Sequence, residues 1–218
     1  MKQIIIPSSV KIIGDGCFSG CKSLEQIEIP SSITSIGKNL FTGCSSLTKI
    51  ALPSSVTFIG EYAFNGCSSL TKFEIPSSVK FINSYTFNEC SSLTKIEIPS
   101  SVKEIKEYAF SRCLLLKQIT IPSSVTSIGG FSFAECKSLE ELTIPSSVNI
   151  IDDNAFIYCA SLKKLIIDST SISFGSNVFI GCSSLIEFSI PHSIESINEN
   201  FFYGCSSLKQ IEIPSSVT

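Results

Sequence analysis

A period of 23 residues runs through the whole sequence and constrains the fold more than any other feature. Proline recurs at this interval, with Asp168 at the one position where proline is missing, and phenylalanine recurs at the same interval. The period is marked by Pro7, Pro30, Pro53, Pro76, Pro99, Pro122, Pro145, Pro191 and Pro214, and by Phe18, Phe41, Phe64, Phe87, Phe110, Phe133, Phe156, Phe179 and Phe202. A repeat of this length predicts a solenoid, in which each repeat buries its apolar face against the next.

Each repeat contains one segment with the alternation of a β-strand. Residues 70–76, L-T-K-F-E-I-P, place apolar and polar side chains in turn, which is typical of a strand with one buried face. Proline ends the strand because it cannot donate a hydrogen bond to the ladder. One strand per repeat, always followed by the same return path, predicts a parallel sheet with strands about 4.8 Å apart.

The return path, residues 53–69, predicts a short helical or 3₁₀ segment. Its apolar residues Val56, Ile59, Ala63 and Phe64 are three to four positions apart, which suits one inward-facing helical stripe. The column of Gly60, which is Gly, Asn or Asp in nearly every repeat, predicts a left-handed or capping turn into this segment. Gly66 and its equivalents predict the end of the segment.

The repeat C-S-S-L-T-K-I-E-I-P-S-S-V-x-x-I-G-x-x-A-F-x-G resembles the BspA-like (Treponema-type) leucine-rich repeat, and the resemblance covers essentially all 218 residues. It implies an α/β right-handed solenoid with a parallel sheet on the concave face and short helical or 3₁₀ segments on the convex face. Proteins of this kind occur in bacteria and protozoa, many at the cell surface. We expect one domain, residues 1–218, with about nine repeats, as an excerpt that lacks terminal caps. The repeat consensus is a folding signature and names no ligand.

Composition excludes several classes of protein. Hydrophobic residues make up 43% of the chain and charged residues 16%, which is too apolar for a disordered chain. The net charge is −3 and there is no run of Lys or Arg, so we expect no nucleic-acid partner. No segment has the roughly 18 consecutive apolar residues of a membrane span, so we expect no membrane insertion.

Cysteine recurs with the period, once per repeat, at Cys21, Cys44, Cys67, Cys90, Cys113, Cys136, Cys159, Cys182 and Cys205. Zinc sites need paired cysteines, and parallel side chains seldom reach disulfide geometry, so this column predicts buried free thiols. Cys17, in the column of Ala63, is also expected to be a packing residue. Free thiols, the absence of N-glycosylation sequons and the absence of a signal peptide favour the cytoplasm, whereas the family resemblance favours the cell surface. The localisation stays open.

No catalytic site, cofactor or metal is expected. His192 is the single histidine, and it replaces a loop serine of the repeat. A serine or cysteine nucleophile would need a base beside it, and Asp152 and Asp153 lie on a turn without a second acidic cluster. We therefore expect a protein that is not an enzyme.

Three groups of residues are candidates for partner binding. The first lies on the strands, where Lys and Glu alternate; the favoured alternative is a mutually neutralising, soluble surface. The second is an aromatic column that either forms an interface or covers the return loops. The third is an apolar patch near the irregular repeat at Asp168, for which a local bulge is the alternative cause. The groups are Lys72, Lys95, Glu74 and Glu97; Tyr62, Tyr85, Tyr108 and Phe131; and Ile157, Ile180 and Tyr203.

The sequence thus predicts a non-enzymatic protein–protein interaction module of scaffold or cell-surface adhesin type. The alternative is a structural spacer or an appendage domain of a larger protein. Exposed solenoid ends and the apolar patch also predict a homodimer.

Overall fold

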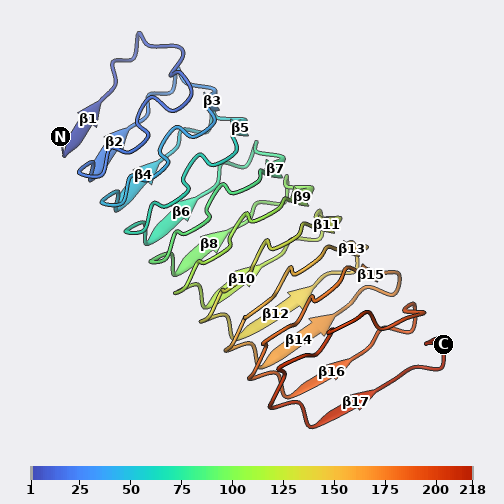
Figure 1. Ribbon diagram of the computed structural model, residues 1–218. Coiled ribbons are helices and arrows are strands. Elements are labelled where there is room, and N and C mark those ends of the chain that lie inside the picture. The colour runs from blue at the N-terminus through green and yellow to red at the C-terminus, as the bar shows by residue number, and fades with distance from the viewer. Residues whose placement is uncertain (1, 218) are drawn as a thin grey trace.

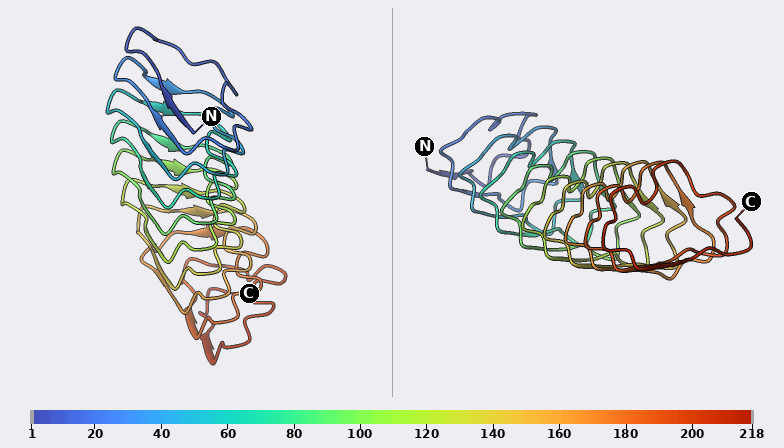
Figure 2. Two further views of the ribbon diagram at one scale, coloured as in Figure 1. Left: turned by 90° about the vertical axis from the view of Figure 1, so that its left-hand side faces the viewer. Right: turned by 60° about the horizontal axis from the view of Figure 1, so that its bottom comes forward.

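A computed structural model describes residues 2–217, which form a continuous stack of similar turns (Figure 1). The two ends of the chain lie at opposite ends of the stack (Figure 2). The first series of strands, one per turn, lies along one face: β1 Gln3–Ile5, β2 Gln26–Glu28, β4 Lys49–Ala51, β6 Lys72–Glu74, β8 Lys95–Glu97, β10 Gln118–Thr120, β12 Glu141–Ile144, β14 Lys164–Ile167, β16 Glu187–Ser189 and β17 Gln210–Glu212. The predicted parallel-stranded solenoid with a 23-residue period is confirmed.

The strands pair in parallel and in register, so that each residue lies beside the equivalent residue of the next repeat. Lys72 pairs with Lys95, for example, and Phe73 with Ile96. The strands of this face are hydrogen-bonded in three groups, β1-β2-β4, β6-β8-β10 and β12-β14-β16-β17. The alternation seen in the sequence places Phe73 inside and Lys72 and Glu74 outside.

A second series of two-residue strands was not expected from the sequence. In seven consecutive repeats these strands follow the turn at proline, or at Asp168 in the last of the seven, and they also pair in parallel: β3 Ser35–Ile36, β5 Phe58–Ile59, β7 Phe81–Ile82, β9 Glu104–Ile105, β11 Ser127–Ile128, β13 Ile150–Ile151 and β15 Ser173–Phe174. Each proline turn before them is closed by a backbone hydrogen bond, as where the Val56 N–H donates to the Pro53 carbonyl. From Ser32 onward, the second serine of each P-S-S turn donates to the preceding repeat, as Ser101 Oγ does to the Val79 carbonyl at 2.6 Å.

The predicted helical or 3₁₀ segments are not found in residues 2–217, and this part of the fold prediction is wrong. In the return path, alternate N–H groups donate to the next repeat instead of along a helix. Tyr62 donates to the Ser84 carbonyl and Phe64 to the Thr86 carbonyl, while Ala63 and Asn65 close turns within their own repeat. The stack of repeats therefore satisfies backbone groups that an isolated segment would satisfy by forming a helix.

The Gly60 column also differs from its prediction, because Gly60 lies outside the left-handed region of backbone conformation. A Cβ atom at Gly60 would lie 2.7 Å from the Lys38 backbone nitrogen, so glycine here permits two repeats to approach closely. Asn83 in the same column donates its side-chain amide to the Ile59 carbonyl at 2.7 Å.

The core is a set of apolar columns that run along the solenoid. The phenylalanine column is fully buried from Phe41 to Phe179, and its rings stack from repeat to repeat. Leucine, isoleucine and valine columns fill the space between this column and the two strand series. Each repeat therefore buries its apolar surface against its two neighbours.

The cysteine column is part of this core. Cys44 through Cys182 are buried, and all ten cysteines are free. Each Sγ from Cys44 onward donates to the carbonyl of a phenylalanine in the preceding repeat, as Cys136 does to Phe110 at 3.2 Å. Burial raises the pKa of the Cys44 thiol to about 11 and that of Cys136 to about 12.

Cys17 differs from its prediction: it is exposed, because it lies in the first turn of the described chain, where no preceding turn covers it.

Candidate functional site

Two columns of the return path have left-handed backbone, with φ between 54° and 78°. The first column consists of Gly16, Asn39, Tyr62, Tyr85, Tyr108, Phe131, Asn154, Asn177 and Asn200. The second consists of Gly20, Gly43, Gly66, Glu89, Arg112, Glu135, Tyr158, Gly181 and Gly204. Glycine and asparagine suit this conformation, whereas a bulky residue is destabilised there by about 1–2 kcal/mol. The two columns depart from the favoured residues together in three central repeats, those of Tyr85, Tyr108 and Phe131.

The central members of the first column form the aromatic stripe, which we define as Tyr62, Tyr85, Tyr108 and Phe131. Their rings stack nearly parallel, with centroids 4.4 Å apart for each tyrosine pair and 4.6 Å apart for the last pair. All of these residues are half-buried. Both ring faces of Tyr85 and Tyr108 are covered by their neighbours, so the stripe presents ring edges and hydroxyl groups to its surroundings.

The central members of the second column form a charge ladder, which we define as Glu89, Arg112 and Glu135. Arg112 bridges its neighbours: Nη1 lies 2.9 Å from Glu89 Oε1, and Nε lies 3.0 Å from Glu135 Oε1. Burial alone would raise the pKa of Glu135, but hydrogen bonds and charge from Arg112 and Lys137 lower it below its ordinary value. The ladder crosses three repeats and holds their surface side chains in place.

A shallow groove of about 390 Å³ lies between the stripe and the ladder. We call it the ridge groove. Its floor includes Ser111 and Ala134, each with 5% of its surface exposed. Ile157 and Tyr158 close one end of it. The structure thus brings Ile157 of the predicted apolar patch together with the predicted aromatic residues.

The rest of the predicted apolar patch lies beyond this groove. Tyr203 is 71% exposed, whereas Ile157 and Ile180 are half-buried. Tyr158 is 51% exposed, and its ring lies against the backbone of Gly181, where a Cβ atom would lie 2.4 Å from Tyr158 Cδ1. The isoleucines are therefore partly covered and do not form one open apolar surface.

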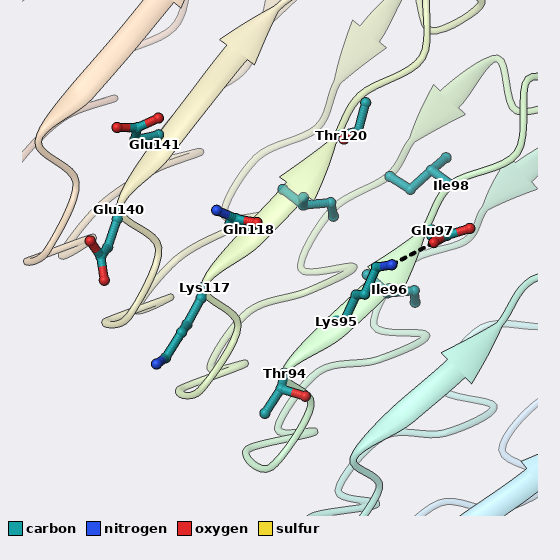
Figure 3. A pocket seen from close by; sticks show the side chains of 11 residues that line it. Thr94, Lys95, Ile96, Glu97, Ile98, Lys117, Gln118, Thr120, Glu140 and Glu141 are labelled. Atoms are coloured by element: carbon teal, nitrogen blue, oxygen red, sulfur yellow. Dashed lines mark ion pairs between the residues drawn. The ribbon is translucent and has the colours of Figure 1, made fainter.

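The charged residues predicted on the strands lie on the outer face of the first strand series. Lys72 and Glu74 are on β6, and Lys95 and Glu97 are on β8, all exposed. Lys95 Nζ lies 2.7 Å from Glu97 Oε1, and this hydrogen bond lowers the pKa of Glu97. A hollow of about 780 Å³ extends over β8, β10 and β12, with Lys95, Glu97, Gln118 and Glu141 among its lining residues (Figure 3).

The ladder is the part of the site that the sequence prediction missed. Its signal was present, because the glycine of that column is replaced in consecutive repeats by Glu89, Arg112 and Glu135, with alternating charge. The period alone does not reveal that this column and the aromatic one share a left-handed backbone.

Among residues 2–217, no group of three or more His, Cys, Asp and Glu side chains could hold a metal ion. Over the same described stretch, no helix is long and apolar enough to cross a membrane.

A parallel-stranded solenoid in which, from β2 onward, a leucine lies two residues before the first-series strand of each 23-residue repeat defines a leucine-rich repeat protein. The family model "BspA type Leucine rich repeat region (6 copies)" matches residues 1–117 and 103–218. The chain therefore belongs to the BspA-type leucine-rich repeat family. Leucine-rich repeat proteins of this family generally mediate protein–protein interactions.

Three solved structures with the same fold come from bacteria. A leucine-rich repeat protein from Bacteroides ovatus ATCC 8483 is 28% identical, with a TM-score of 0.55, over 100% of this chain and 74% of that one. A leucine-rich cell surface protein from Faecalibacterium prausnitzii A2-165 is 29% identical, with a TM-score of 0.56, over the same shares. The leucine-rich repeat protein of T. pallidum is 29% identical, with a TM-score of 0.58, over 84% of this chain and 77% of that one. No curated protein matches the sequence.

Proposed function

We propose that this chain is a non-enzymatic protein-binding module of scaffold or cell-surface adhesin type, and that the aromatic stripe is its main contact surface. One observation carries the proposal: bulky aromatic residues occupy left-handed backbone positions where other repeats have Gly or Asn. Residues held in unfavourable backbone conformations are concentrated at functional sites.

Stability alone is a poor explanation of the stripe. A stacked aromatic pair contributes about 0.5–1.5 kcal/mol beyond its buried area. Left-handed backbone at a bulky residue destabilises by about 1–2 kcal/mol. The two effects nearly cancel, so replacing Asn with Tyr in this column adds little to the stability of the fold. Exposed aromatic edges in a row are the kind of surface that protein interfaces favour.

The other predicted contact residues rank below the stripe. On the strand face, Lys95 and Glu97 pair with each other in an exposed position, which leaves less charge for a partner. In the apolar patch, Ile157 and Ile180 are partly covered. A homodimer through the solenoid ends or this patch stays a prediction.

The test compares two matched variants. In the stripe variant, Tyr62, Tyr85, Tyr108 and Phe131 are all replaced by Asn, the residue that neighbouring repeats have in this column. In the strand-face variant, Lys72, Lys95, Glu74 and Glu97 are replaced by Ser, which leaves the net charge unchanged. Both variants and the wild type are immobilised and exposed to extracts of cells and extracellular matrix, and retained proteins are identified by mass spectrometry.

We expect the wild type and the strand-face variant to retain the same discrete proteins and the stripe variant to lose them. A circular dichroism spectrum and urea midpoint close to those of the wild type show that the stripe variant is folded. Equal retention by wild type and stripe variant would overturn the role of the stripe. Retention of no specific protein by the wild type would favour the alternative, a spacer or appendage domain of a larger protein.

A further inference from the structure

The two tyrosine pairs of the aromatic stripe are the most closely stacked rings among residues 2–217. The ring centroids of Tyr62 and Tyr85 are 4.4 Å apart with an interplanar angle of 8°, and those of Tyr85 and Tyr108 have the same values. Successive rings of the inner phenylalanine column are 5.4 Å apart or more. Tyr85 therefore has a tyrosine ring against each of its two faces.

The backbone holds these rings in register. The Tyr62 N–H donates to the carbonyl of Ser84, the residue before Tyr85, and the Tyr85 N–H donates to the carbonyl of Glu107, the residue before Tyr108. The three tyrosines also have nearly the same φ, between 55° and 59°. Equivalent residues with the same backbone and parallel rings present equivalent atoms to each other. Each Cε carbon of Tyr85, ortho to the hydroxyl group, therefore faces a Cε carbon of each neighbouring ring.

The edges of the stack are open to a small oxidant. The rings of Tyr62, Tyr85 and Tyr108 are half-buried, and the ridge groove is lined by Tyr85 and Tyr108. Burial, followed by the neighbouring tyrosines and Glu107, raises the pKa of the Tyr85 hydroxyl. At neutral pH this phenol is protonated, so its oxidation removes both an electron and a proton.

The other oxidisable side chains are buried, lie outside the stripe or have no tyrosine beside them. The chain has no Trp, its single methionine is Met1, and the cysteines in the repeats of the three tyrosines are buried. Of the two remaining tyrosines, Tyr158 is 51% exposed and Tyr203 is 71% exposed. Neither has a tyrosine at the equivalent position of an adjacent repeat of the chain. Coupling between tyrosines of successive repeats is therefore confined to the stripe.

We propose that Tyr85 is a site of oxidative cross-linking, at which a dityrosine forms with Tyr62 or Tyr108 and joins two successive repeats covalently. The co-reactant is a peroxidase that uses hydrogen peroxide. This inference concerns covalent modification of the stripe and does not rest on the proposed function.

Hydrogen peroxide balances the reaction. Each phenol loses one electron and its hydroxyl proton, and the unpaired electron is shared among the oxygen, the two Cε carbons and Cγ, where Cβ blocks coupling. Radicals in adjacent rings form a Cε–Cε bond. Each ring then loses the hydrogen of that Cε carbon as a proton and its oxygen regains a proton, which restores both phenols. One C–C bond replaces two C–H bonds, and the two electrons and two protons reduce one hydrogen peroxide molecule to two waters.

The stack supplies the arrangement that this coupling needs. Holding two reacting groups side by side makes their reaction effectively unimolecular, so stacked radicals couple before two protein molecules meet. A bond from Tyr85 to either neighbour joins residues 23 positions apart in the sequence. Such a cross-link restricts the unfolded chain and thereby stabilises the folded solenoid.

The test treats the purified full chain, at low concentration, with a haem peroxidase and hydrogen peroxide. Dityrosine is measured by its fluorescence in protein that migrates as a monomer on a reducing, denaturing gel. Trypsin places Tyr62, Tyr85 and Tyr108 on three separate peptides, residues 50–72, 81–95 and 107–112. We expect mass spectrometry to find the Tyr85 peptide joined to either of the other two, with the loss of two hydrogen atoms.

Variants separate the effect of stacking from that of exposure. Tyr85→Phe keeps a ring in the stack but removes the phenol that both pairs share, so the dityrosine yield of the monomer should fall about tenfold or more. Tyr108→Phe leaves one pair and should lower the yield by about half. The matched control, Tyr158→Phe combined with Tyr203→Phe, has fewer tyrosines than Tyr85→Phe, yet its yield should equal that of the wild type. The untreated variants should share the circular dichroism spectrum of the wild type.

Cross-linking should also raise the urea midpoint of the wild type, and the same treatment should not raise that of Tyr85→Phe. Absence of dityrosine from the wild-type monomer, an equal yield in Tyr85→Phe, or cross-links that map mainly to Tyr158 or Tyr203 would overturn the inference. None of these outcomes bears on the proposed function, which the retention experiment tests with the untreated stripe variant.

Discussion

Two aromatic columns run along this solenoid, one inside it and one on its surface, and they differ in extent. The inner column is unbroken from Phe18 to Phe202, with centroids of successive rings 5.4–6.3 Å apart. The outer column is aromatic only from Tyr62 to Phe131, and the repeats on either side have Gly or Asn with the same left-handed backbone. The fold requires a ring inside every repeat. At the outer position it requires only a residue that adopts left-handed backbone. Folding therefore does not demand an aromatic residue there, and binding can determine which residue is present.

The largest expected effect concerns the thiol column, which lies beside the inner rings. Burial raises the pKa of these thiols, to about 11 for Cys44 and about 12 for Cys136, above the ordinary value of 9.0. The folded protein therefore holds the protons more tightly than the unfolded chain. The stabilisation is complete below about pH 9 and is lost as pH rises toward the folded-state values, by about 1.4 kcal/mol per pH unit for each thiol. With thiols stacked in successive repeats, we expect the urea midpoint to collapse between pH 9 and 11.

Cys136→Ala separates this effect from the titration of other groups. The variant should be less stable than the wild type at pH 7.5 because it leaves a small cavity. Its free energy of unfolding should fall less steeply with pH, by about 1.4 kcal/mol per pH unit. Equal slopes in wild type and variant, measured by urea melts followed by circular dichroism, would contradict a buried neutral thiol at this position.

The second prediction tests the difference between the two columns within a single repeat. Phe110 is fully buried and stacks on Phe87 and Phe133, whereas Tyr108, two residues earlier, is half-buried in the stripe. Phe110→Ala should reduce the free energy of unfolding by about 3–5 kcal/mol. Tyr108→Asn should change it by about 1 kcal/mol or less, because lost stacking is offset by relief of backbone strain. A large loss of stability in Tyr108→Asn would show that the stripe belongs to the core.

The sequence predicted the buried core of the repeats better than it predicted their surface and return path. Period and alternation predicted the parallel strands and their register, because residues such as Phe73 are dictated by burial in every repeat. The same reasoning predicted a helical return path and missed the second series of strands and the charge ladder. Spacing within one repeat resembles that of a helix, but hydrogen bonds such as that from Tyr62 to Ser84 run between repeats. A local pattern does not contain those partners, and it does not tell which columns adopt left-handed backbone.

A smaller effect is expected from placing a side chain in the second left-handed column. Gly66 has φ of 70°, and a Cβ atom there would lie 3.6 Å from Gly43, an ordinary contact. Gly66→Ala should therefore destabilise the protein by about 1–2 kcal/mol through backbone strain alone. The same substitution tests how much strain the central repeats tolerate. An unchanged urea midpoint would mean that the stack imposes this backbone without strain, and the argument from the aromatic stripe would lose its support.

The smallest expected effect is the reverse substitution in the charge ladder. Glu89 has φ of 60°, and its ion pair with Arg112 is exposed, so Glu89→Gly removes strain and gives up little ion-pair energy. We expect a gain in the free energy of unfolding of about 0.5 kcal/mol, measured by urea melts followed by circular dichroism. Glu89→Gln keeps the backbone strain and removes the charge, so it should not show this gain in stability. A stabilised Glu89→Gly variant would show that Glu at this position is strained and that its ion pair with Arg112 does not offset the strain. A destabilised variant would instead make the ladder a structural brace between repeats.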